Sequence, residues 1–234
     1  MLGRDDLTVT CFLPCRKGSE RVPRKNIRPI GDKPYGLLQI KLEQLFATKL
    51  IDRVILSTND EEIIEYAKKL EASKLDIRLR DDALASSSTS TDELIQYAGS
   101  QIEAGHILWT HVTSPFLTAT LYDAMIEKYL AQLECGYDSL MSVNELRGFI
   151  WDESRPVNYD RSVEKWPRTQ TLSPLYEINS GVFLAPAEVY QLSGDRIGDR
   201  PYKYVLDKIQ GFDIDWEEDF LMADAMLSAG ICET

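Results

Sequence analysis

The sequence has few of the residues that usually bind transition metals. It contains two histidines, His106 and His111, and none of its four cysteines forms a C-x-x-C pair. Structural zinc sites need several such ligands at short spacings, so we expect no zinc site. We predict that the cysteines are reduced thiols in a cytoplasmic protein and that most of them fill the core. They are Cys11, Cys15, Cys135 and Cys232.

Long apolar stretches and an excess of positive charge are also missing. No segment approaches the roughly 18 apolar residues of a membrane-spanning helix, and the first residues, MLGRDDL, lack the apolar part of a signal peptide. We therefore expect a protein that neither spans a membrane nor is secreted by that route. The formal net charge of −12 disfavours general binding to nucleic acids and anionic membranes, because both attract positive surfaces.

Short apolar runs alternate with longer amphipathic segments along a chain of 234 residues, which is long enough to bury a sizeable core. The apolar runs predict strands at Thr8–Leu13, Arg53–Ser57, Asp76–Leu79, His106–Val112 and Ser139–Val143. Helical spacing of apolar residues predicts helices at Tyr35–Thr48, Asp60–Leu70, Asp92–Ile102 and Leu121–Leu133. This alternation predicts an α/β fold with a mainly parallel sheet sandwiched by helices.

The alternation stops between Glu145 and Asn179, where prolines and aromatic residues accumulate. We predict an irregular excursion from the sheet that acts as a lid or a dimerisation arm. Beyond it, regular structure is predicted to resume at Gly181–Leu184 and Lys203–Ile209 and to end with a helix near Glu217–Ser228.

The most informative segment is a basic loop, LPCRKGSERVPRKN, which spans Leu13–Asn26 and follows the first predicted strand. Between Arg16 and Lys33 the chain carries seven Lys or Arg residues and two acidic ones, although the chain as a whole is acidic. A loop with Gly18, Ser19 and several cations at the carboxyl end of a strand suits a nucleotide triphosphate. A solvated basic loop is the alternative, and the place of this loop at the strand end favours an anion site.

Two aspartates, Asp213 and Asp215, flank Ile214 near the end of the sequence. In an extended segment their side chains point to the same side, with Cα atoms about 7 Å apart. Two carboxylates on one side suit Mg²⁺, which keeps several waters and bridges to phosphates. The alternative is an acid-rich helix N-terminus, since Asp215, Glu217 and Glu218 would favour the helix dipole. The basic loop in the same chain favours the metal site.

Three further groups carry weaker signals. Arg80, with Leu84-Ala85-Ser86 after it, suits either a ribose or base clamp or a surface turn. His111 ends a predicted strand, where it is either a substrate contact or a satisfied core residue. In the irregular excursion, the candidates are Arg168 and Gln170 with Tyr176 and Asn179, and arginine there either binds a carboxylate or is solvated.

Together these motifs resemble the CMP-sialic acid synthetases, also called acylneuraminate or nonulosonic acid cytidylyltransferases. The segment Pro14–Asn26 is similar to the family motif PARxGSKxxPxKN, and Arg80 with Leu84-Ala85-Ser86 is similar to RPxxLAS. Thr113-Ser114-Pro115 matches the TSP of QPTSPL, and the segment Asp213–Phe220 matches DIDxxxDF. The resemblance covers nearly the whole chain. It implies one cytidylyltransferase domain over residues 1–234, Rossmann-like and of the nucleotide-diphospho-sugar transferase type, with a dimerisation arm at about 145–180.

The resemblance implies a Mg²⁺-dependent nucleotidyltransferase that transfers CMP from CTP to the anomeric hydroxyl of a sialic-acid-like keto sugar acid and releases pyrophosphate. It implies that Arg16, Lys25, Asp213 and Asp215 are catalytic, and that both aspartates hold Mg²⁺. It assigns nucleotide binding to Arg16, Ser19, Lys25, Asn26, Arg80 and Ser86, and sugar binding to His111, Arg168, Gln170, Tyr176 and Asn179. We expect a cytoplasmic homodimer that binds no nucleic acid or membrane.

Three positions depart from the family pattern. Glu20 stands where lysine is usual, and Lys17 and Arg21 are candidates to replace the lost charge. His111 replaces a glutamine, and Ser180 separates Asn179 from its glycine, so a nonulosonate or ulosonate related to N-acetylneuraminate is as good a candidate substrate. Two other functions stay open: a glycosyltransferase that uses the two aspartates as a DxD metal motif, and a non-catalytic nucleotide- or sugar-binding module.

Overall fold

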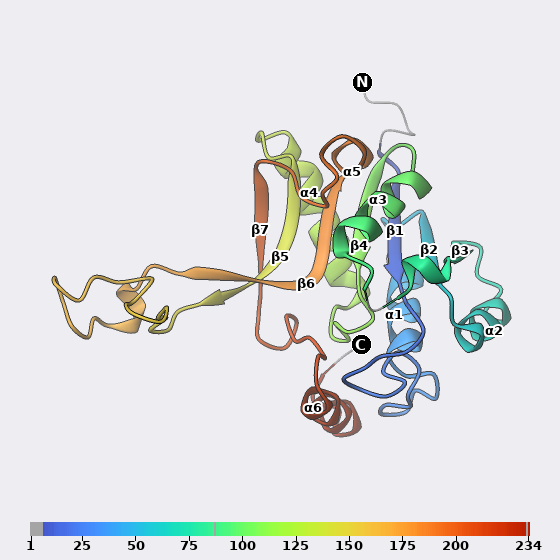
Figure 1. The fold of residues 1–234 in the computed structure, drawn as a ribbon, viewed down its shortest axis with the longest axis horizontal. Coiled ribbons are helices and arrows are strands. Elements are labelled where there is room, and N and C mark those ends of the chain that lie inside the picture. Colours follow the sequence, from blue (N-terminus) through green and yellow to red (C-terminus); the bar gives the residue numbers. More distant parts are fainter. Residues whose placement is uncertain (1–6, 87, 233) are drawn as a thin grey trace.

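Seven strands form one sheet in the computed structural model, which describes residues 7–86, 88–232 and 234. Their order across the sheet is β3-β2-β1-β4-β6-β5-β7 (Figure 1). Only β6 runs against the others, and it pairs antiparallel with both β4 and β5. The mainly parallel sheet predicted from the sequence is confirmed. The strands are β1 (Val9–Pro14), β2 (Arg53–Thr58), β3 (Leu75–Leu79), β4 (His106–Thr110), β5 (Ser139–Leu146), β6 (Leu175–Pro186) and β7 (Pro201–Leu206).

Helices cover both faces of the sheet, as predicted. Along β1, Cys11 and Leu13 belong to the core cluster that also contains α1, α2, α4 and α6, whereas Phe12 belongs to the cluster that contains α3 and α5. Alternate residues of a strand point to opposite faces, so β1 is apolar on both sides because both sides are covered. The helices are α1 (Gly36–Ala47), α2 (Glu61–Lys69), α3 (Thr91–Gln101), α4 (Ala119–Leu133), α5 (Ala187–Ser193) and α6 (Glu217–Ser228).

Local sequence signals set several helix boundaries. The side chain of Asp60 accepts a hydrogen bond from the Glu62 backbone N–H at the start of α2. Ser90 and Glu93 form a reciprocal capping box at the start of α3. Such caps satisfy backbone N–H groups that have no partner within the helix. The predicted boundaries of α6 are confirmed to the residue, whereas the seven-residue α5 is missing from the sequence prediction.

The excursion between residues 145 and 179 is present, but the prediction that it is irregular throughout was wrong. Strands β5 and β6 continue into it as a two-stranded ribbon, in which Glu145 pairs with Tyr176 and Leu146 with Leu175. The ribbon and the segment 147–174 at its tip form an arm that extends away from the sheet (Figure 1). Both faces of such a ribbon meet solvent, with Tyr176 40% exposed and its neighbour Glu177 exposed as well, so it lacks the apolar alternation that reveals a strand.

Among the described residues, no helix combines the length and the apolar composition needed to cross a bilayer.

Candidate functional site

Three segments meet at the carboxyl edge of the sheet. The basic loop leaves β1, the Thr113-Ser114-Pro115 segment follows β4, and the Asp213–Asp215 segment lies between β7 and α6. The Ile214 backbone N–H donates to the Thr113 carbonyl at 2.9 Å, and Lys25 Nζ donates to the Ile214 carbonyl at 2.7 Å. Ligands of open α/β sheets bind at this edge, so the topology brings the predicted site residues to the expected place.

The basic loop forms one wall of a pocket of about 540 Å³, which we call the basic pocket. Gly18 holds the loop open with a φ of +74°, a conformation that glycine adopts without strain. Among the described residues, no hydrogen bond uses the backbone N–H of Gly18 or Ser19, and such groups suit an anion. The pocket is lined by Arg16, Lys17, Gly18, Ser19, Pro23, Arg24, Lys25, Asn26, Ile27, Asp60, Glu61 and Glu62.

Most of the positive charge between Arg16 and Lys33 is engaged within the protein. Four of the seven cations in this range form ion pairs: Arg21 with Asp215, Arg24 with Glu62, Arg28 with Glu217 and Lys33 with Glu43. No ion pair in the described part of the chain includes Arg16 or Lys17. Asn26 Nδ2 donates to the Arg16 carbonyl at 3.1 Å and so holds that end of the loop. The charge available to an anion in the basic pocket therefore comes mainly from Arg16, Lys17 and Lys25.

Lys25 lies at the boundary between the loop and the two aspartates. Its side chain is buried, and burial lowers the pKa of the ammonium group, whereas the negative charges of Asp215 and Asp213 raise it. An ammonium group in this position is poorly hydrated and close to both the basic pocket and the carboxylates. It can therefore stabilise negative charge more strongly than a lysine in water.

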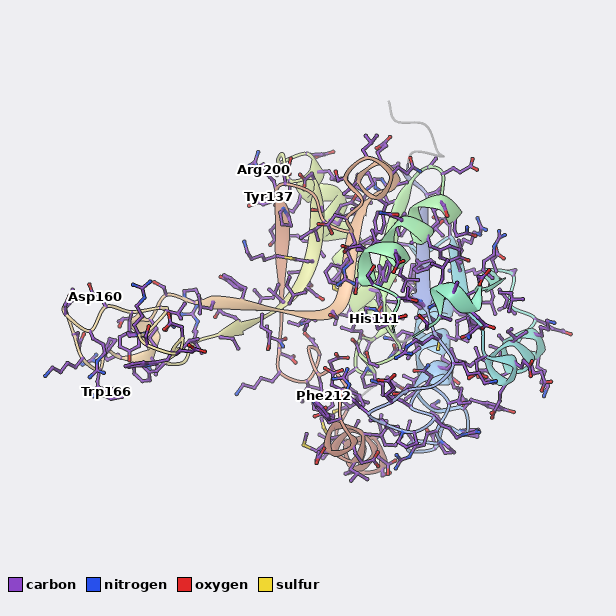
Figure 2. The ribbon with its side chains drawn as sticks, viewed as in Figure 1. His111, Tyr137, Asp160, Trp166, Arg200 and Phe212 are labelled. Carbon is purple, nitrogen blue, oxygen red and sulfur yellow. The ribbon has the colours of Figure 1, made fainter. Side chains whose placement is uncertain are left out.

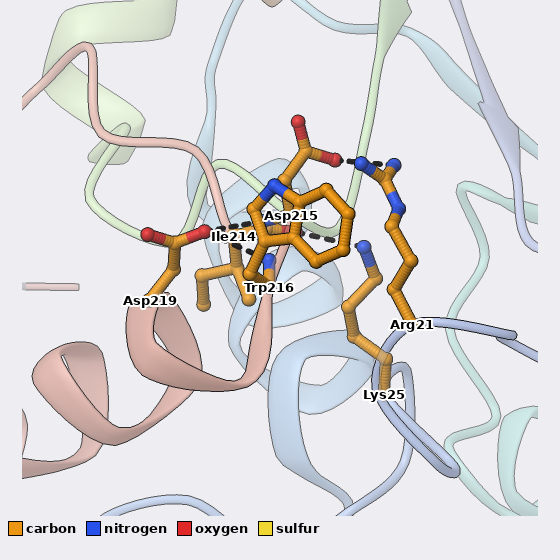
Figure 3. Close-up of polar contacts among 6 residues, drawn as sticks. All are labelled: Arg21, Lys25, Ile214, Asp215, Trp216 and Asp219. Atoms are coloured by element: carbon orange, nitrogen blue, oxygen red, sulfur yellow. Dashed lines mark hydrogen bonds and ion pairs between the residues drawn. The ribbon is translucent and has the colours of Figure 1, made fainter.

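Asp213 and Asp215 line a second pocket of about 470 Å³, which we call the acidic pocket. Ile214 between them is fully buried in the core, whereas the two aspartates are partly exposed. Asp213 Oδ1 is buried without a hydrogen-bond partner, and burial raises the pKa of the Asp213 carboxyl. Asp219 accepts from the backbone N–H groups of Asp215 and Trp216, at 3.0 and 2.8 Å, and thereby fixes the segment against α6 (Figure 3).

Arg80 and Ser86, predicted to bind the base and ribose, line neither pocket. Arg80 is buried at the end of β3, where its Nε and Nη2 donate to the Ser57 hydroxyl and carbonyl at 3.0 and 2.6 Å. Burial lowers the pKa of Arg80, and the positive charge of the nearby Arg16 adds to this shift. The Ser86 hydroxyl contacts those of Ser88 and Thr89 in an exposed turn.

The structure gives His111 two internal hydrogen bonds. Trp109 Nε1 donates to His111 Nε2 at 2.9 Å, so Nδ1 carries the proton and donates to the Ser180 carbonyl at 3.0 Å. Burial lowers the pKa of His111 to about 4, which keeps the ring neutral at physiological pH. Figure 2 shows His111 beside the sheet, away from the arm. A direct contact between this ring and a sugar requires one of the two hydrogen bonds to break.

Asn179 lies in the acidic pocket, at the centre of a polar network. Its Oδ1 accepts from the Ser142 hydroxyl at 2.6 Å, and its Nδ2 donates to Asn144 Oδ1 at 2.9 Å. The Asn144 amide in turn donates to Glu177 at 3.2 Å. This pocket is also lined by Asn144, Glu177 and Lys208, which no sequence motif indicated. The rule that ligands bind at strand ends could have identified Asn144, because it lies near the end of β5.

The remaining predicted sugar residues lie on the arm. Arg168 and Gln170 belong to a short 3₁₀ turn near the arm tip and line neither pocket of their own chain. Tyr176 lies at the arm base, with Lys203 Nζ 5.7 Å from its ring centroid. Figure 2 shows Trp166 and Asp160 at the far end of the arm, away from His111. Within one chain, therefore, the structure brings together Arg16, Ser19, Lys25, Asn26, Asn179, Asp213 and Asp215 but not the arm residues.

A buried lysine stabilises the segment that follows β4 at this edge of the sheet. Lys41, on α1, is fully buried, and its Nζ donates to the Ser114 carbonyl and the Tyr122 hydroxyl, both at 2.8 Å. Burial lowers the pKa of Lys41 to about 7, and the nearby Cys11 and Asp213 oppose this shift. The ammonium group thereby fixes the segment that contacts Ile214.

Replacing Lys41 with methionine is expected to change stability in a pH-dependent way. Above pH 7 the folded wild-type protein releases the Lys41 proton, whereas the unfolded chain keeps it up to its ordinary pKa. The wild type therefore gains stability relative to the variant as the pH rises, by roughly 3 kcal/mol between about pH 7 and 9.5. Urea unfolding at both pH values measures this shift. Lys74→Met, which removes a donor to the Thr48 carbonyl, is the control, and a pH-independent difference for Lys41→Met would contradict the prediction.

Comparison with known proteins identifies the family. A family model described as Cytidylyltransferase matches residues 10–180. The chain belongs to this family. Cytidylyltransferases are nucleotidyltransferases, and the matched residues include the basic loop and the carboxyl edge of the sheet but not the two aspartates.

Two curated relatives of this cytidylyltransferase chain are named for pseudaminic acid and for N-acylneuraminate. It is 33% identical over 123 residues to a pseudaminic acid cytidylyltransferase of Campylobacter jejuni strain 81-176, a match that covers 51% of this chain and 52% of the relative. It is 27% identical over 222 residues to an N-acylneuraminate cytidylyltransferase of Escherichia coli O18:K1:H7, covering 92% of this chain and 51% of the relative. The chain thus spans about half the length of these curated relatives.

Solved structures show that this cytidylyltransferase chain shares its fold with enzymes of low sequence identity. One neighbour is CMP:2-keto-3-deoxy-manno-octonic acid synthetase complexed with CTP, with a TM-score of 0.65, 14% identity and coverage of 95% of this chain and 99% of the other. Another is 4-diphosphocytidyl-2C-methyl-D-erythritol synthase from Anaerococcus prevotii, with a TM-score of 0.68, 15% identity and coverage of 95% and 97%. The predicted nucleotide-diphospho-sugar transferase type of fold is confirmed.

Proposed function

We propose that this chain transfers CMP from CTP to the anomeric hydroxyl of a sialic-acid-like keto sugar acid and releases pyrophosphate. The observation that carries the proposal is the position of Lys25, which lines the basic pocket and donates to the Ile214 carbonyl between the two aspartates. This contact joins an anion pocket to a carboxylate pair. The names of the two curated relatives support a nonulosonic acid as the acceptor.

Asp213 and Asp215 are the proposed ligands of Mg²⁺. The buried Asp213 oxygen that has no hydrogen-bond partner fits this role, because a cation would satisfy it. The described residues contain no group of three or more His, Cys, Asp or Glu side chains arranged for a metal, and two carboxylates suit Mg²⁺, which keeps several waters. When bound, Mg²⁺ would neutralise phosphate charge and acidify the sugar hydroxyl.

The side chains of the two pockets supply positioning and charge. Attack of the anomeric oxygen on the α-phosphorus builds negative charge on the phosphate oxygens and on the departing pyrophosphate. Arg16 and Lys25 are placed to stabilise that charge, and no covalent nucleophile is needed. In the acidic pocket, Lys208 is a candidate partner for the acceptor's carboxylate, and Asn179 with Asn144 offers hydrogen bonds to its hydroxyl groups.

Pyrophosphate release from CTP tests the proposal. The purified protein is incubated with Mg²⁺, CTP and a panel of keto sugar acids that includes N-acetylneuraminate, pseudaminate and 3-deoxy-manno-octulosonate. We expect pyrophosphate only when CTP and a matching acid are both present, and much less with UTP or ATP. Absence of release with every acid would reject the proposal, and release of a nucleoside diphosphate from a nucleotide sugar would favour a glycosyltransferase.

We also propose that the arm mediates a homodimer. Its tip exposes large apolar side chains, including Trp166 at 66% and Val163 at 83%, and exposed apolar clusters commonly mark interfaces. Light scattering is expected to give twice the mass of one chain. A mass that stays monomeric at high protein concentration would reject this assignment.

A further inference from the structure

One ion pair connects the two pockets. Arg21 Nη2 lies 2.7 Å from Asp215 Oδ1, so a cation of the basic loop is bound to a carboxylate of the acidic pocket (Figure 3). Trp216 lies under the guanidinium group, with its ring centroid 5.0 Å from Arg21 Cζ. The contact joins residues 194 positions apart in the sequence, so only the folded chain reveals it.

The ion pair between Arg21 and Asp215 adds little to the stability of the fold. The two side chains are 46% and 47% exposed, and an exposed ion pair contributes little to stability. Arg21 also lies near Lys25, and the repulsion between their positive charges lowers the pKa of Lys25. By contrast, Arg28 reaches both oxygens of Glu217 at 2.8 and 2.9 Å and covers the Phe220 ring, so another arginine fastens the loop to α6.

A divalent cation and Arg21 compete for the same carboxylate. A divalent cation coordinated by Asp215 would weaken the contact of this carboxylate with Arg21, because the two cations repel each other at such distances and draw on the same negative charge. Once the cation has bound to Asp215, the Arg21 guanidinium group would be stabilised by contact with another anion. The nearest class of anion is the phosphate chain of a nucleotide in the basic pocket, whose walls are formed by the residues on both sides of Arg21 in the same loop.

We propose that Arg21 is an exchangeable ligand, which neutralises Asp215 in the free protein and binds a nucleotide phosphate once a divalent cation has bound to Asp215. The planar guanidinium group suits both partners, because it pairs with carboxylate and phosphate oxygens in the same forked geometry. The inference rests on the proposed nucleotidyl transfer. It assigns a phosphate contact to a residue that lines neither pocket in the free protein.

The decisive variant is Arg21→Met, compared with Arg78→Met as a control. Arg78 is also an ion-paired arginine, with a side chain 44% exposed, and it lies on β3 away from both pockets. Two binding constants are measured: that of Mn²⁺ for the nucleotide-free protein, by electron paramagnetic resonance, and that of Mg²⁺–CTP, by calorimetry. Neither requires turnover.

Arg21→Met is expected to change the two affinities in opposite directions. Mn²⁺ should bind the nucleotide-free variant about tenfold more tightly, and Mg²⁺–CTP about tenfold more weakly, the size expected for one charge-assisted hydrogen bond. Arg78→Met should change neither affinity. A merely structural role of Arg21 predicts that both affinities fall together.

Unchanged Mg²⁺–CTP binding by Arg21→Met, or unchanged or weaker Mn²⁺ binding, would overturn the inference. Arg21→Lys keeps the positive charge but lacks the planar guanidinium group. It should therefore restore wild-type Mn²⁺ binding but only part of the Mg²⁺–CTP affinity. If the wild type binds Mg²⁺–CTP and releases no pyrophosphate with any sugar acid, the proposed function fails while the comparison of Arg21 variants still decides this inference. A wild type that binds no Mg²⁺–CTP overturns both.

Discussion

Replacing Asp213 with asparagine is expected to lower kcat/KM for pyrophosphate release about 10²- to 10³-fold. Asparagine keeps the shape of the side chain but removes the charge that would hold Mg²⁺. The folding stability of the variant should equal or exceed that of the wild type at neutral pH, because burial raises the pKa of the Asp213 carboxyl and so disfavours its ionised form. Steady-state kinetics and thermal unfolding of the same preparation measure both quantities.

Asp123→Asn is the matched control for Asp213→Asn. Asp123 accepts from the backbone N–H groups of Lys49 and Leu50 and lines neither pocket, so its replacement should leave kcat/KM unchanged. An Asp213→Asn variant that loses stability and activity together would indicate a structural role instead. Retention of wild-type kcat/KM would remove Asp213 from the reaction.

Replacing Lys25 with methionine is expected to lower kcat/KM by a comparable factor, about 10²- to 10³-fold. The variant loses a poorly hydrated positive charge in the basic pocket and also leaves the Ile214 carbonyl without its donor. The affinity for Mg²⁺–CTP and kcat should both fall, because Lys25 contacts the basic pocket and the segment that holds the aspartates. Calorimetry gives the affinity, and pyrophosphate release at saturating CTP gives kcat.

Lys74→Met is the control for losing a lysine that donates to a backbone carbonyl. Lys74 Nζ also donates to a backbone carbonyl, that of Thr48, at 2.7 Å, but it lies away from both pockets. Its replacement should cost some stability and no activity. If Lys25→Met binds Mg²⁺–CTP and turns over as the wild type does, Lys25 has no part in phosphate binding.

The fold was largely predictable because local signals and global topology agree. Apolar runs such as that of β1 have both faces buried, and caps such as Asp60 and the Ser90–Glu93 pair mark helix starts. The arm ribbon was not predictable in the same way. Its strands are stabilised by pairing with each other in solvent, which leaves no hydrophobic period in the sequence.

The candidate site was predictable in its parts but not in its contacts. The place of the basic loop after the first predicted strand indicated a site at the carboxyl edge of the sheet, and the presence of this loop in the same chain favoured a metal site at the aspartate pair. The sequence could not show that Arg80 is bound to Ser57, or that His111 uses both ring nitrogens within the protein. The contact between His111 and Ser180 depends on the pairing of β4 with β6, and the one between Arg80 and Ser57 on the pairing of β3 with β2. The bond between Trp109 and His111 depends instead on how two nearby side chains are oriented.

The sequence by itself determined the α/β class, the sheet edge that carries the site, and the residue types available for phosphate and metal binding. Hydrophobic periodicity, composition and the order of the motifs are properties of the sequence, so they can be recognised without the folded structure. Only the tertiary structure decided how the basic loop divides its charges, with Arg21 on Asp215 and Lys25 on Ile214, while Arg16 has no ion pair among the described residues. The physical reason is that ion pairing depends on distances of a few ångströms between segments nearly 200 residues apart in the sequence.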